Sequence, residues 1–211
     1  MSREHILHRV RTALARSEGN PSPVPPPVRL RLPEVDLETR VASFTARIEA
    51  LAGRVARAAM PAAACAQVSQ AVQGKQTVVS NAAFLQECGI ASLPGVRSGV
   101  TDARALRDLC AVADVGITSA DYALADTGTL VLLSSPHEAR MISLLPPSHI
   151  AVLPCTRLLS GLDELFTRLP DPASVTSSMV LITGPSRTAD IEQILVRGVH
   201  GPGQLSVVLV G

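Results

Sequence analysis

The stretch VLITGPSRTADIE, residues 180–192, places a glycine, hydroxyl side chains and an arginine directly after an apolar run. Gly184 permits a tight turn. We expect a strand ending near Thr183, then a helix whose acidic start suits its positive dipole end. Free N–H groups at such a helix start hold phosphate or carboxylate, and Arg187 adds a charged planar donor. The predicted anion site consists of Gly184, Pro185, Ser186, Arg187, Thr188 and Asp190.

A second candidate stretch, ADTGTLVL, precedes another apolar run. Gly128 stands between two threonines, and this arrangement lets a ligand approach exposed backbone N–H groups closely. Asp126 is the carboxylate best suited to general-base or substrate-orienting chemistry. The sequence therefore adds Asp126, Thr127, Gly128 and Thr129 to the candidate site.

Further polar side chains follow in the C-terminal half of the chain. Arg140 lies in the segment SSPHEAR, which is expected to open a helical turn, and His149 follows two prolines at the start of a predicted strand. His200 stands among glycines in VRGVHGPGQ, which predicts a tight loop that presents the ring, with Gly201 and Pro202 beside it. We treat Asp126 and His200 as the candidate catalytic residues, and Arg140, Gly201 and Pro202 with the remaining residues of the two turns as ligand-binding residues. His149 is not assigned to the site.

Each of these stretches also has a purely structural interpretation. The turn at Arg187 can be a capped connection in which the guanidinium pairs with local acids. Asp126 can satisfy turn amides, His149 can be a hydrogen-bonded residue at a strand end, and His200 can bind backbone. The sequence alone leaves both interpretations open.

The cysteines argue against a metal centre in this chain. Cys65, Cys88, Cys110 and Cys155 are widely spaced, without a Cys-x-x-Cys pair, and the histidine spacing matches no metal site. We expect these cysteines to be small core residues in a reducing cytoplasm. A Gly-x-Ser-x-Gly nucleophile motif is also lacking.

Composition limits the remaining function classes. The formal net charge of +1 and the aromatic content of 2% provide neither a basic surface nor stacking platforms for nucleic acid. No apolar run approaches the roughly 20 residues of a membrane-spanning helix. The N-terminus lacks the pattern of a secretory signal, so we expect a cytoplasmic protein.

Two regions follow from the pattern along the chain. Residues 1–33 combine a basic amphipathic helix with the proline-rich stretch GNPSPVPPPVRLRLP, which cannot continue a helix. We expect that helix to dock on a partner or on another copy of the chain. Residues 34–211 alternate helical stretches with apolar runs such as VGITSA, TLVLLS, HIAVLP, MVLIT and LSVVLV. This alternation predicts an α/β domain with a mainly parallel sheet and a ligand beyond the carboxyl ends of its strands.

Taken together, the motifs ADYALADTGTLVL, Arg140, LLPPSHIAVLP, ITGPSRTADIE and GVHGP resemble the lactate-utilisation protein C group of the LUD-domain family. The resemblance is strong from about Val115 to Gly211. It implies an architecture like that of the sugar-phosphate isomerases and CoA-transferases. It also implies that a shared site is shaped by Thr127, Gly128, Gly184, Pro185, Ser186, Arg187, Thr188, Asp190, His200, Gly201 and Pro202.

The resemblance implies a non-redox role in a three-component bacterial system that oxidises L-lactate to pyruvate. The iron–sulfur clusters are then expected in the two partner components, with no cofactor in this chain and a small carboxylate or phosphate as its ligand. One residue departs from the family pattern, because glutamate is expected where Asp126 stands. The shorter carboxylate puts a catalytic role in doubt more than a role as a turn or ligand anchor.

Two other functions remain open. The first is a free-standing enzyme that acts on a phosphorylated or CoA-linked small molecule, with Asp126, Arg187 and His200 as its acid–base and anion-binding set. The second is a structural interaction module without a ligand. The residues themselves do not choose between lactate, pyruvate, phosphate and a CoA-like ligand.

Overall fold

The computed structural model describes residues 2–15, 35–191 and 194–211. Within these ranges, the side chains of residues 188–197 are not described. The chain divides into two compact units, Met1–Arg31 and Leu32–Gly211. In the first unit, α1 (Arg3–Ala13) confirms the predicted helix, and the Ser2 hydroxyl accepts from the His5 N–H at its start. Its apolar residues Ile6 and Val10 are about half exposed. The proline-rich stretch lies outside the described residues, and the docking of α1 stays a prediction.

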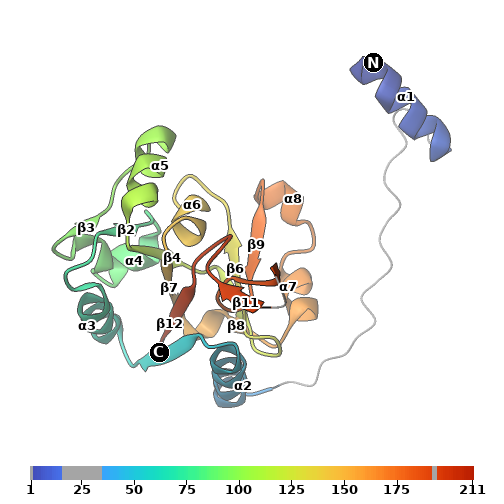
Figure 1. Ribbon diagram of the computed structural model, residues 1–211. Helices are drawn as coiled ribbons and strands as arrows, with labels where there is room; N and C mark the ends of the chain where they lie inside the picture. The colour runs from blue at the N-terminus through green and yellow to red at the C-terminus, as the bar shows by residue number, and fades with distance from the viewer. Residues whose placement is uncertain (1, 16–34, 192–193) are drawn as a thin grey trace. The chain divides into compact units, whose positions relative to one another are not determined.

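A parallel sheet forms the centre of the second unit (Figure 1). Its six strands run in the order β1-β12-β7-β4-β2-β3, and every neighbouring pair is parallel. Their bounds are β1 Arg54–Ala58, β2 Thr77–Val79, β3 Val96–Arg97, β4 Val115–Ser119, β7 Ser148–Pro154 and β12 Gln204–Val210. The interior strands are mainly apolar because both faces of the sheet are covered. The predicted α/β fold with a mainly parallel sheet is confirmed.

Alternate residues of each strand face different helices. Ile150 and Val152 of β7 pack in a cluster with α3 (Pro61–Val72), α4 (Ala83–Glu87) and the 3₁₀ helix η1 (Ile90–Ser92). Ala151 and Leu153 pack on the other face with α2 (Leu37–Ala50). On that second face, α5 (Ala103–Val112) and α6 (Met141–Leu144) cover β2. His149, which precedes Ile150, therefore points to the same face as α2 and α6.

A smaller second sheet lies beside the central one and departs from the sequence prediction (Figure 1). It has the order β8-β5-β6-β9 and comprises β5 Tyr122–Leu124, β6 Thr129–Leu133, β8 Leu158–Leu159 and β9 Met179–Ile182. Only β5 and β8 are parallel; β6 pairs antiparallel with β5 and with β9. The apolar runs TLVLLS and MVLIT are thus strands, but they do not belong to the parallel sheet. The helices η2 (Cys155–Arg157), α7 (Leu162–Arg168) and α8 (Pro172–Val175) complete this part.

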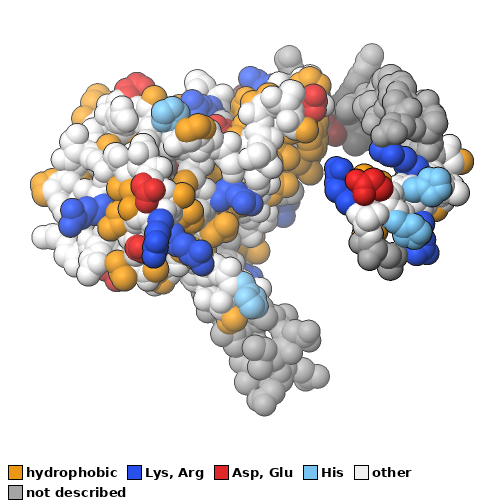
Figure 2. All heavy atoms as spheres, turned by 90° about the horizontal axis from the view of Figure 1, so that it is seen from above, with side chains coloured by type: hydrophobic (Ala, Val, Ile, Leu, Met, Phe, Trp, Pro, Cys, Tyr) orange, Lys and Arg blue, Asp and Glu red, His pale blue; other side chains and the backbone are white. Residues whose placement is uncertain are grey.

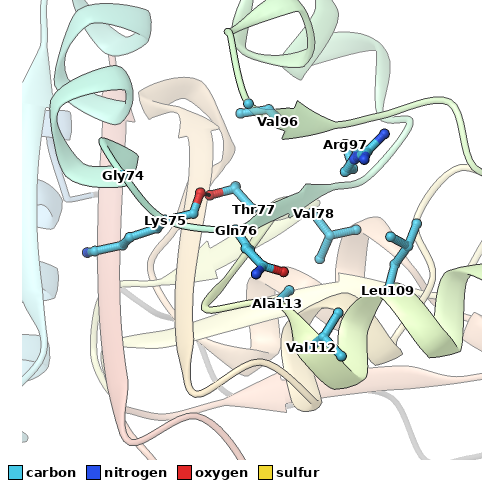
Figure 3. Close-up of a pocket in the computed structure, with 11 residues that line it drawn as sticks. Gly74, Lys75, Gln76, Thr77, Val78, Val96, Arg97, Leu109, Val112 and Ala113 are labelled. Carbon is cyan, nitrogen blue, oxygen red and sulfur yellow. Dashed lines mark hydrogen bonds between the residues drawn. The ribbon is translucent and has the colours of Figure 1, made fainter.

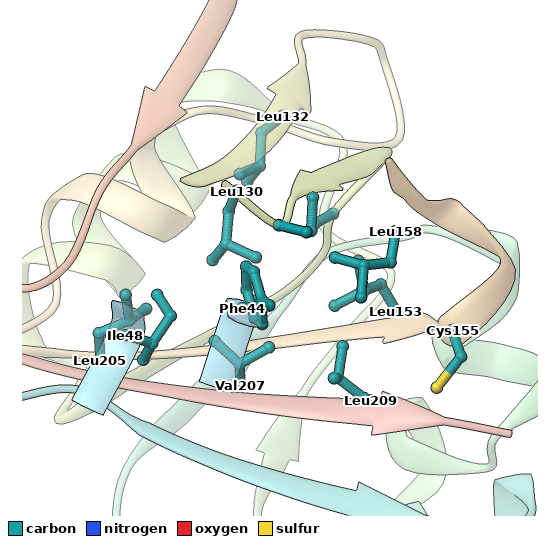
Figure 4. Close-up of a cluster of buried hydrophobic side chains, with 14 residues drawn as sticks. Phe44, Ile48, Leu130, Leu132, Leu153, Cys155, Leu158, Leu205, Val207 and Leu209 are labelled. Atoms are coloured by element: carbon teal, nitrogen blue, oxygen red, sulfur yellow. The ribbon is translucent and has the colours of Figure 1, made fainter. Parts of the chain in front are cut away.

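The main core fills the space between the two sheets (Figure 4). Phe44 and Ile48 of α2 are completely buried there, between Leu130 of β6 and Val207 of β12. Phe44 is the largest of these side chains, so its replacement by alanine is expected to cost about 3–5 kcal/mol of stability. This packing makes α2 the element that fixes the second sheet against the first.

The segment after Gly184 also differs from its prediction. It forms a hairpin of β10 (Arg187–Ile191) and β11 (Ile194–Arg197) instead of a helix. The predicted helix start at Asp190 and Glu192 was therefore wrong, and Glu192 lies outside the described residues. Without a helix there, the expected dipole and its row of free N–H groups cannot hold an anion. Any anion site at this turn must rest on side chains and loop backbone.

The described surface carries charges of both signs. Figure 2 shows basic and acidic side chains interspersed on one face of the α/β domain, without a continuous basic surface. Within the described residues, none of the helices has the length and apolar character needed to cross a membrane.

Candidate functional site

The C-terminal half of α2 supports both candidate turns. Gly128 has a φ of +68° and Gly184 a φ of +85°, in the left-handed region that favours glycine. A Cβ atom on Gly128 would lie 2.7 Å from the Cβ of Arg47, and one on Gly184 would lie 2.9 Å from the Cβ of Leu51. Both positions therefore require glycine. Because the two turns pack on the same end of one helix, they lie next to each other.

Three threonine hydroxyls join the turns directly. The Oγ1 atoms of Thr127 and Thr129 lie 2.8 Å apart, and Thr129 Oγ1 lies 2.8 Å from Thr183 Oγ1. Thr129 is buried, so its hydroxyl depends on these two partners. The hydrogen bonds confirm that the structure brings the ADTGT and ITGPS stretches together.

The loop that carries His200 packs against the same turn. The Ser186 N–H donates to the Pro202 carbonyl at 2.8 Å, and the Gly198 N–H donates to the Ser186 carbonyl at 3.0 Å. The exposed Arg187 guanidinium donates to the carbonyl of Leu51, at the C-terminal end of α2. Three loops distant in sequence thus converge beside α2, and Arg187 has a backbone partner in addition to any ligand.

A cavity of about 330 Å³, called the three-loop cavity below, lies beside these converging loops. Residues of the ITGPS and GVHGP loops line it, whereas the ADTGT loop does not. This volume is at the lower end of the range for small-molecule pockets. Seven predicted site residues line it, namely Gly184, Pro185, Ser186, Arg187, His200, Gly201 and Pro202. Arg187 and His200 are exposed, and the other walls include the apolar residues Leu144, Val180, Leu181, Ile182 and Leu205. The cavity can therefore offer the Arg187 guanidinium and the His200 imidazole to a ligand with a small apolar part.

His149 also lines this cavity, and its position follows from close packing of α6. A Cβ atom on Gly116 would lie only 1.9 Å from the Ile142 carbonyl oxygen, so glycine lets α6 approach β4. Gly116 is paired with His149 across β4 and β7. His149 is 1% exposed, and its Nε2 lies 2.8 Å from the hydroxyl of Thr118. Burial lowers the pKa of His149 to about 4, so the ring is neutral at pH 7.

Of the other seven predicted residues, five do not line the cavity, namely Asp126, Thr127, Gly128, Thr129 and Arg140. Asp126 is exposed, and its carboxylate lies against Gly161, the residue that begins α7; a Cβ atom there would be 2.6 Å from Asp126 Oδ2. Arg140 immediately precedes α6, and its guanidinium donates to the Ser178 hydroxyl at 3.2 Å, next to the opposite end of β9. Thr188 and Asp190 belong to β10, but their side chains lie outside the described part. Asp126 and His200 are therefore not shown to form one catalytic set.

The cavity lies at the amino ends of the central strands. His149 and Leu205 are the second residues of β7 and β12 and pair with each other. The predicted location beyond the carboxyl ends of the strands does not match this cavity. The loop that carries His200 leads directly into β12, and the other two loops pack beside it on α2. The loops therefore lie at the end of the sheet where β12 begins.

A buried carboxyl group at the opposite edge escaped the sequence prediction. Glu138 is 7% exposed, and its Oε2 accepts from the Ser80 hydroxyl at 2.9 Å and from the Ser119 N–H at 3.3 Å. Burial raises the pKa of Glu138 to about 8, opposed by these two hydrogen bonds and assisted by the charge of Asp121. Ser80 directly follows β2, and Ser119 is the last residue of β4. Because these residues and Glu138 are far apart in the sequence, no local pattern predicts the cluster.

A larger open cavity of about 780 Å³ contains none of the predicted residues (Figure 3). It lies at the amino end of β2 and is bordered by Lys75, Gln76 and Arg97. The Lys75 ammonium donates to the Ala71 carbonyl, and the Gln76 N–H donates to the carboxylate of Asp114. Because seven residues predicted from the sequence line the three-loop cavity and none lines this one, the three-loop cavity is the better candidate site.

Metal ligands do not assemble in the described structure. Groups of three or more His, Cys, Asp or Glu residues close enough to hold a metal ion are not found among the residues searched. Cys88, Cys110 and Cys155 are buried and Cys65 is half-buried, which bears out their prediction as core residues. Burial raises the pKa of Cys88 and of Cys110 to about 11, so both remain uncharged thiols at neutral pH.

Comparison with known proteins places these observations in a family. The LUD domain model matches residues 41–210. Lactate utilization protein C from Exiguobacterium sp. is 43% identical over 110 residues, which cover 50% of this chain and 48% of that protein. The Bacillus subtilis protein of the same name is 42% identical over 102 residues, 46% of this chain and 42% of that protein. The matched regions thus span no more than about half the length of these relatives.

The fold has a solved counterpart. A DUF162 family protein from Deinococcus radiodurans superposes with a TM-score of 0.65 at 17% identity, over 84% of this chain and 100% of that one. At this identity the likeness supports the architecture alone. The family model, which extends from α2 to the end of β12, covers both sheets and all three converging loops. The chain therefore belongs to the LUD domain family.

Proposed function

We propose that this chain is the non-redox component of a bacterial system that oxidises L-lactate to pyruvate, and that it binds a small carboxylate in the three-loop cavity. The observation that carries the proposal is the convergence of the ADTGT, ITGPS and GVHGP stretches beside α2. The names of the similar proteins supply the metabolic context, since those relatives are called lactate utilization protein C.

The chemistry of the cavity favours a carboxylate. Arg187 has a planar fork of donors that matches the two oxygens of a carboxylate. The apolar walls formed by Leu144 and Leu205 suit a short alkyl group. L-lactate and pyruvate each combine a carboxylate with a methyl group and fit within about 330 Å³. In this proposal the Arg187 guanidinium binds the ligand. It either keeps its hydrogen bond to the Leu51 carbonyl or gives it up when the ligand binds.

Oxidation of L-lactate removes two electrons and two protons, and this chain is not expected to accept the electrons. We assign electron transfer to iron–sulfur clusters in two partner components. The part of this chain is then to hold substrate or product beside those components. Docking through α1, which presents Ile6 and Val10 to solvent, is one way to form the assembly.

The alternative of a free-standing acid–base enzyme receives less support. It requires Asp126 to act with Arg187 and His200, but Asp126 packs against Gly161 and does not line the cavity. A general base must lie within hydrogen-bond reach of the proton that it removes. The geometry therefore favours binding over catalysis by this set.

Growth of the host tests the proposal. A strain that lacks this gene and any paralogue should fail to grow on L-lactate and grow normally on pyruvate, and the wild-type gene should restore growth. A biochemical arm uses the two partner components with an artificial electron acceptor, with and without this chain. Normal growth of the deletion strain on L-lactate, or full dye reduction without this chain, contradicts the proposal.

A further inference from the structure

Two observations meet at His149. The ring lines the three-loop cavity, yet its Nδ1 atom is buried and has no hydrogen-bond partner within the described structure. Buried polar atoms are nearly always hydrogen-bonded, so an unpaired one at a cavity wall indicates a missing partner. Thr118 engages the other ring nitrogen, Nε2, so no protein group within the described structure pairs with Nδ1.

The proton on this ring can be assigned from the neighbouring hydroxyl. Thr118 is 0% exposed, and His149 Nε2 is the acceptor that the described structure provides for its hydroxyl hydrogen. If Nε2 carried a proton, that buried hydroxyl hydrogen would remain unpaired. Thr118 therefore donates to Nε2. A neutral imidazole carries a single N–H group, so the proton lies on Nδ1.

We propose that the Nδ1–H of His149 is the hydrogen-bond donor that holds an oxygen atom of the ligand at the cavity wall. The inference deepens the proposed carboxylate site and rests on it. A neutral donor selects an oxygen that only accepts, such as the oxo group of a 2-oxo acid. The hydroxyl of a 2-hydroxy acid also accepts, but its own hydrogen then needs a further acceptor.

The ligand class that follows is a short 2-oxo carboxylate, with pyruvate as the smallest member to test. Its carboxylate matches the guanidinium of Arg187, its oxo oxygen matches His149, and its methyl group matches the apolar wall. Since His149 is neutral, the charge complementary to the carboxylate has to come from Arg187 or from other residues at the cavity. Pyruvate should then bind several-fold more tightly than L-lactate, because only its oxo oxygen is purely an acceptor.

Nitrogen-15 spectra of the imidazole rings test the inference on the wild-type protein. The His149 signals, identified by their absence in His149→Asn, should show the Nδ1–H tautomer and should not titrate between pH 5 and 8. Addition of pyruvate should shift the Nδ1 resonance. An Nε2–H tautomer, or an unshifted Nδ1 resonance while calorimetry reports pyruvate binding, overturns the inference.

Two variants give an independent readout by calorimetry with pyruvate, L-lactate, acetate and phosphate as probes. In His149→Asn the side-chain amide nitrogen takes roughly the place of Nδ1, and pyruvate affinity should remain within about threefold. In His149→Gln the amide reaches toward Thr118 instead, and affinity should fall about tenfold, as expected for a lost hydrogen bond. The control is His137→Gln, an exposed histidine outside this cavity, which should bind like wild type.

The outcomes separate this inference from the proposed function. If both His149 variants bind pyruvate as wild type does, the inference is wrong and the carboxylate site stands. If no probe binds the wild-type protein, the inference fails, while growth on L-lactate still decides the metabolic role. If the variants do not fold, the spectra of the wild-type protein decide the inference alone.

Discussion

Glu138 and His149 are both buried polar residues next to the central sheet, but they lie at opposite edges of it. Glu138 lies at the carboxyl ends of β2 and β4, where ligands usually bind in open α/β sheets. Its carboxyl group contacts Ser80 and Ser119, whereas the cavity of about 180 Å³ beside it is lined by its chain neighbours His137 and Ala139. His149 lies at the amino end of β7 and lines the three-loop cavity itself.

The two residues are similarly buried, and they differ in whether a cavity that could hold a ligand is lined by the residue itself. Glu138 has a strongly perturbed carboxyl group without a cavity bordered by that group. His149 has an unpaired nitrogen and is a lining residue of the three-loop cavity, which the exposed Arg187 and His200 also line. We therefore expect changes at Glu138 to alter stability and its pH dependence, and changes in the three-loop site to alter ligand binding.

The largest expected effect concerns Glu138 and pH. Its pKa is about 8 in the folded protein and about 4.5 in an unfolded chain, so between these values the folded state binds one more proton. The free energy of unfolding should therefore fall as pH rises through this window. The decrease from this group approaches ~1.4 kcal/mol per pH unit. Below about pH 4.5 the group is protonated in both states and its contribution is constant.

Denaturant unfolding of wild type and Glu138→Gln between pH 4.5 and 8.5 measures this effect. The variant keeps the shape of the protonated side chain but cannot ionise, so its stability should lack this decrease and exceed that of wild type near pH 8. Equal pH slopes in the two proteins would show that Glu138 is not protonated in the native state.

The next effect concerns the contact that places α6 beside His149. Gly116→Ala should destabilise the protein by about 3 kcal/mol, because the added methyl group meets a backbone oxygen that has to move. The matched control is Gly201→Ala, whose Cβ atom would meet Ser186 at an ordinary 3.5 Å. Chemical denaturation compares both variants with wild type. Similar stability of the two variants would mean that α6 is not held closely against β4.

A smaller effect is expected from the hydroxyl chain that joins two of the loops. Thr129→Val keeps the shape of the side chain and removes both hydrogen bonds, so it should cost about 1–2 kcal/mol. Thr127→Val removes one bond at an exposed position and should cost within about 0.5 kcal/mol. Thermal melts of both variants give the comparison. An equal loss of stability in both variants would mean that the hydrogen bond between Thr127 and Thr129 provides the stabilisation, and that the bond to Thr183 adds little.

Much of the fold could be predicted because local patterns determine it. The apolar runs after Asp114 and Ser148 predict strands, and Pro61 marks the start of α3. The pairing of those strands is less local. β6 and β9 are as apolar as β4, but they join the second sheet because their partners are each other and β5. The amino-acid composition of a strand does not indicate which of the two sheets it joins.

The site was predicted in part for the same reason. Turn glycines such as Gly128 and Gly184 are visible in sequence because the backbone requires them there. The hairpin that begins at Arg187 is wrongly predicted as a helix, since acidic residues followed by spaced apolar ones suit both structures. The binding potential of His149 was not visible, because it depends on Thr118, 31 residues away, and on the approach of α6.

The central claim is that Arg187 serves a ligand rather than only its bond to Leu51. Calorimetric titration of pyruvate, L-lactate and phosphate into wild type, Arg187→Lys and Arg187→Ala, with thermal melts of all three, tests it most directly. A charge-assisted hydrogen bond contributes about 1.5–3 kcal/mol, so Arg187→Ala should weaken binding by roughly one to two powers of ten. Arg187→Lys should fall between, and the melting temperatures should change little, because the bond to Leu51 is exposed. A protein in which Arg187→Ala melts several degrees lower and binds as tightly as wild type would contradict the account.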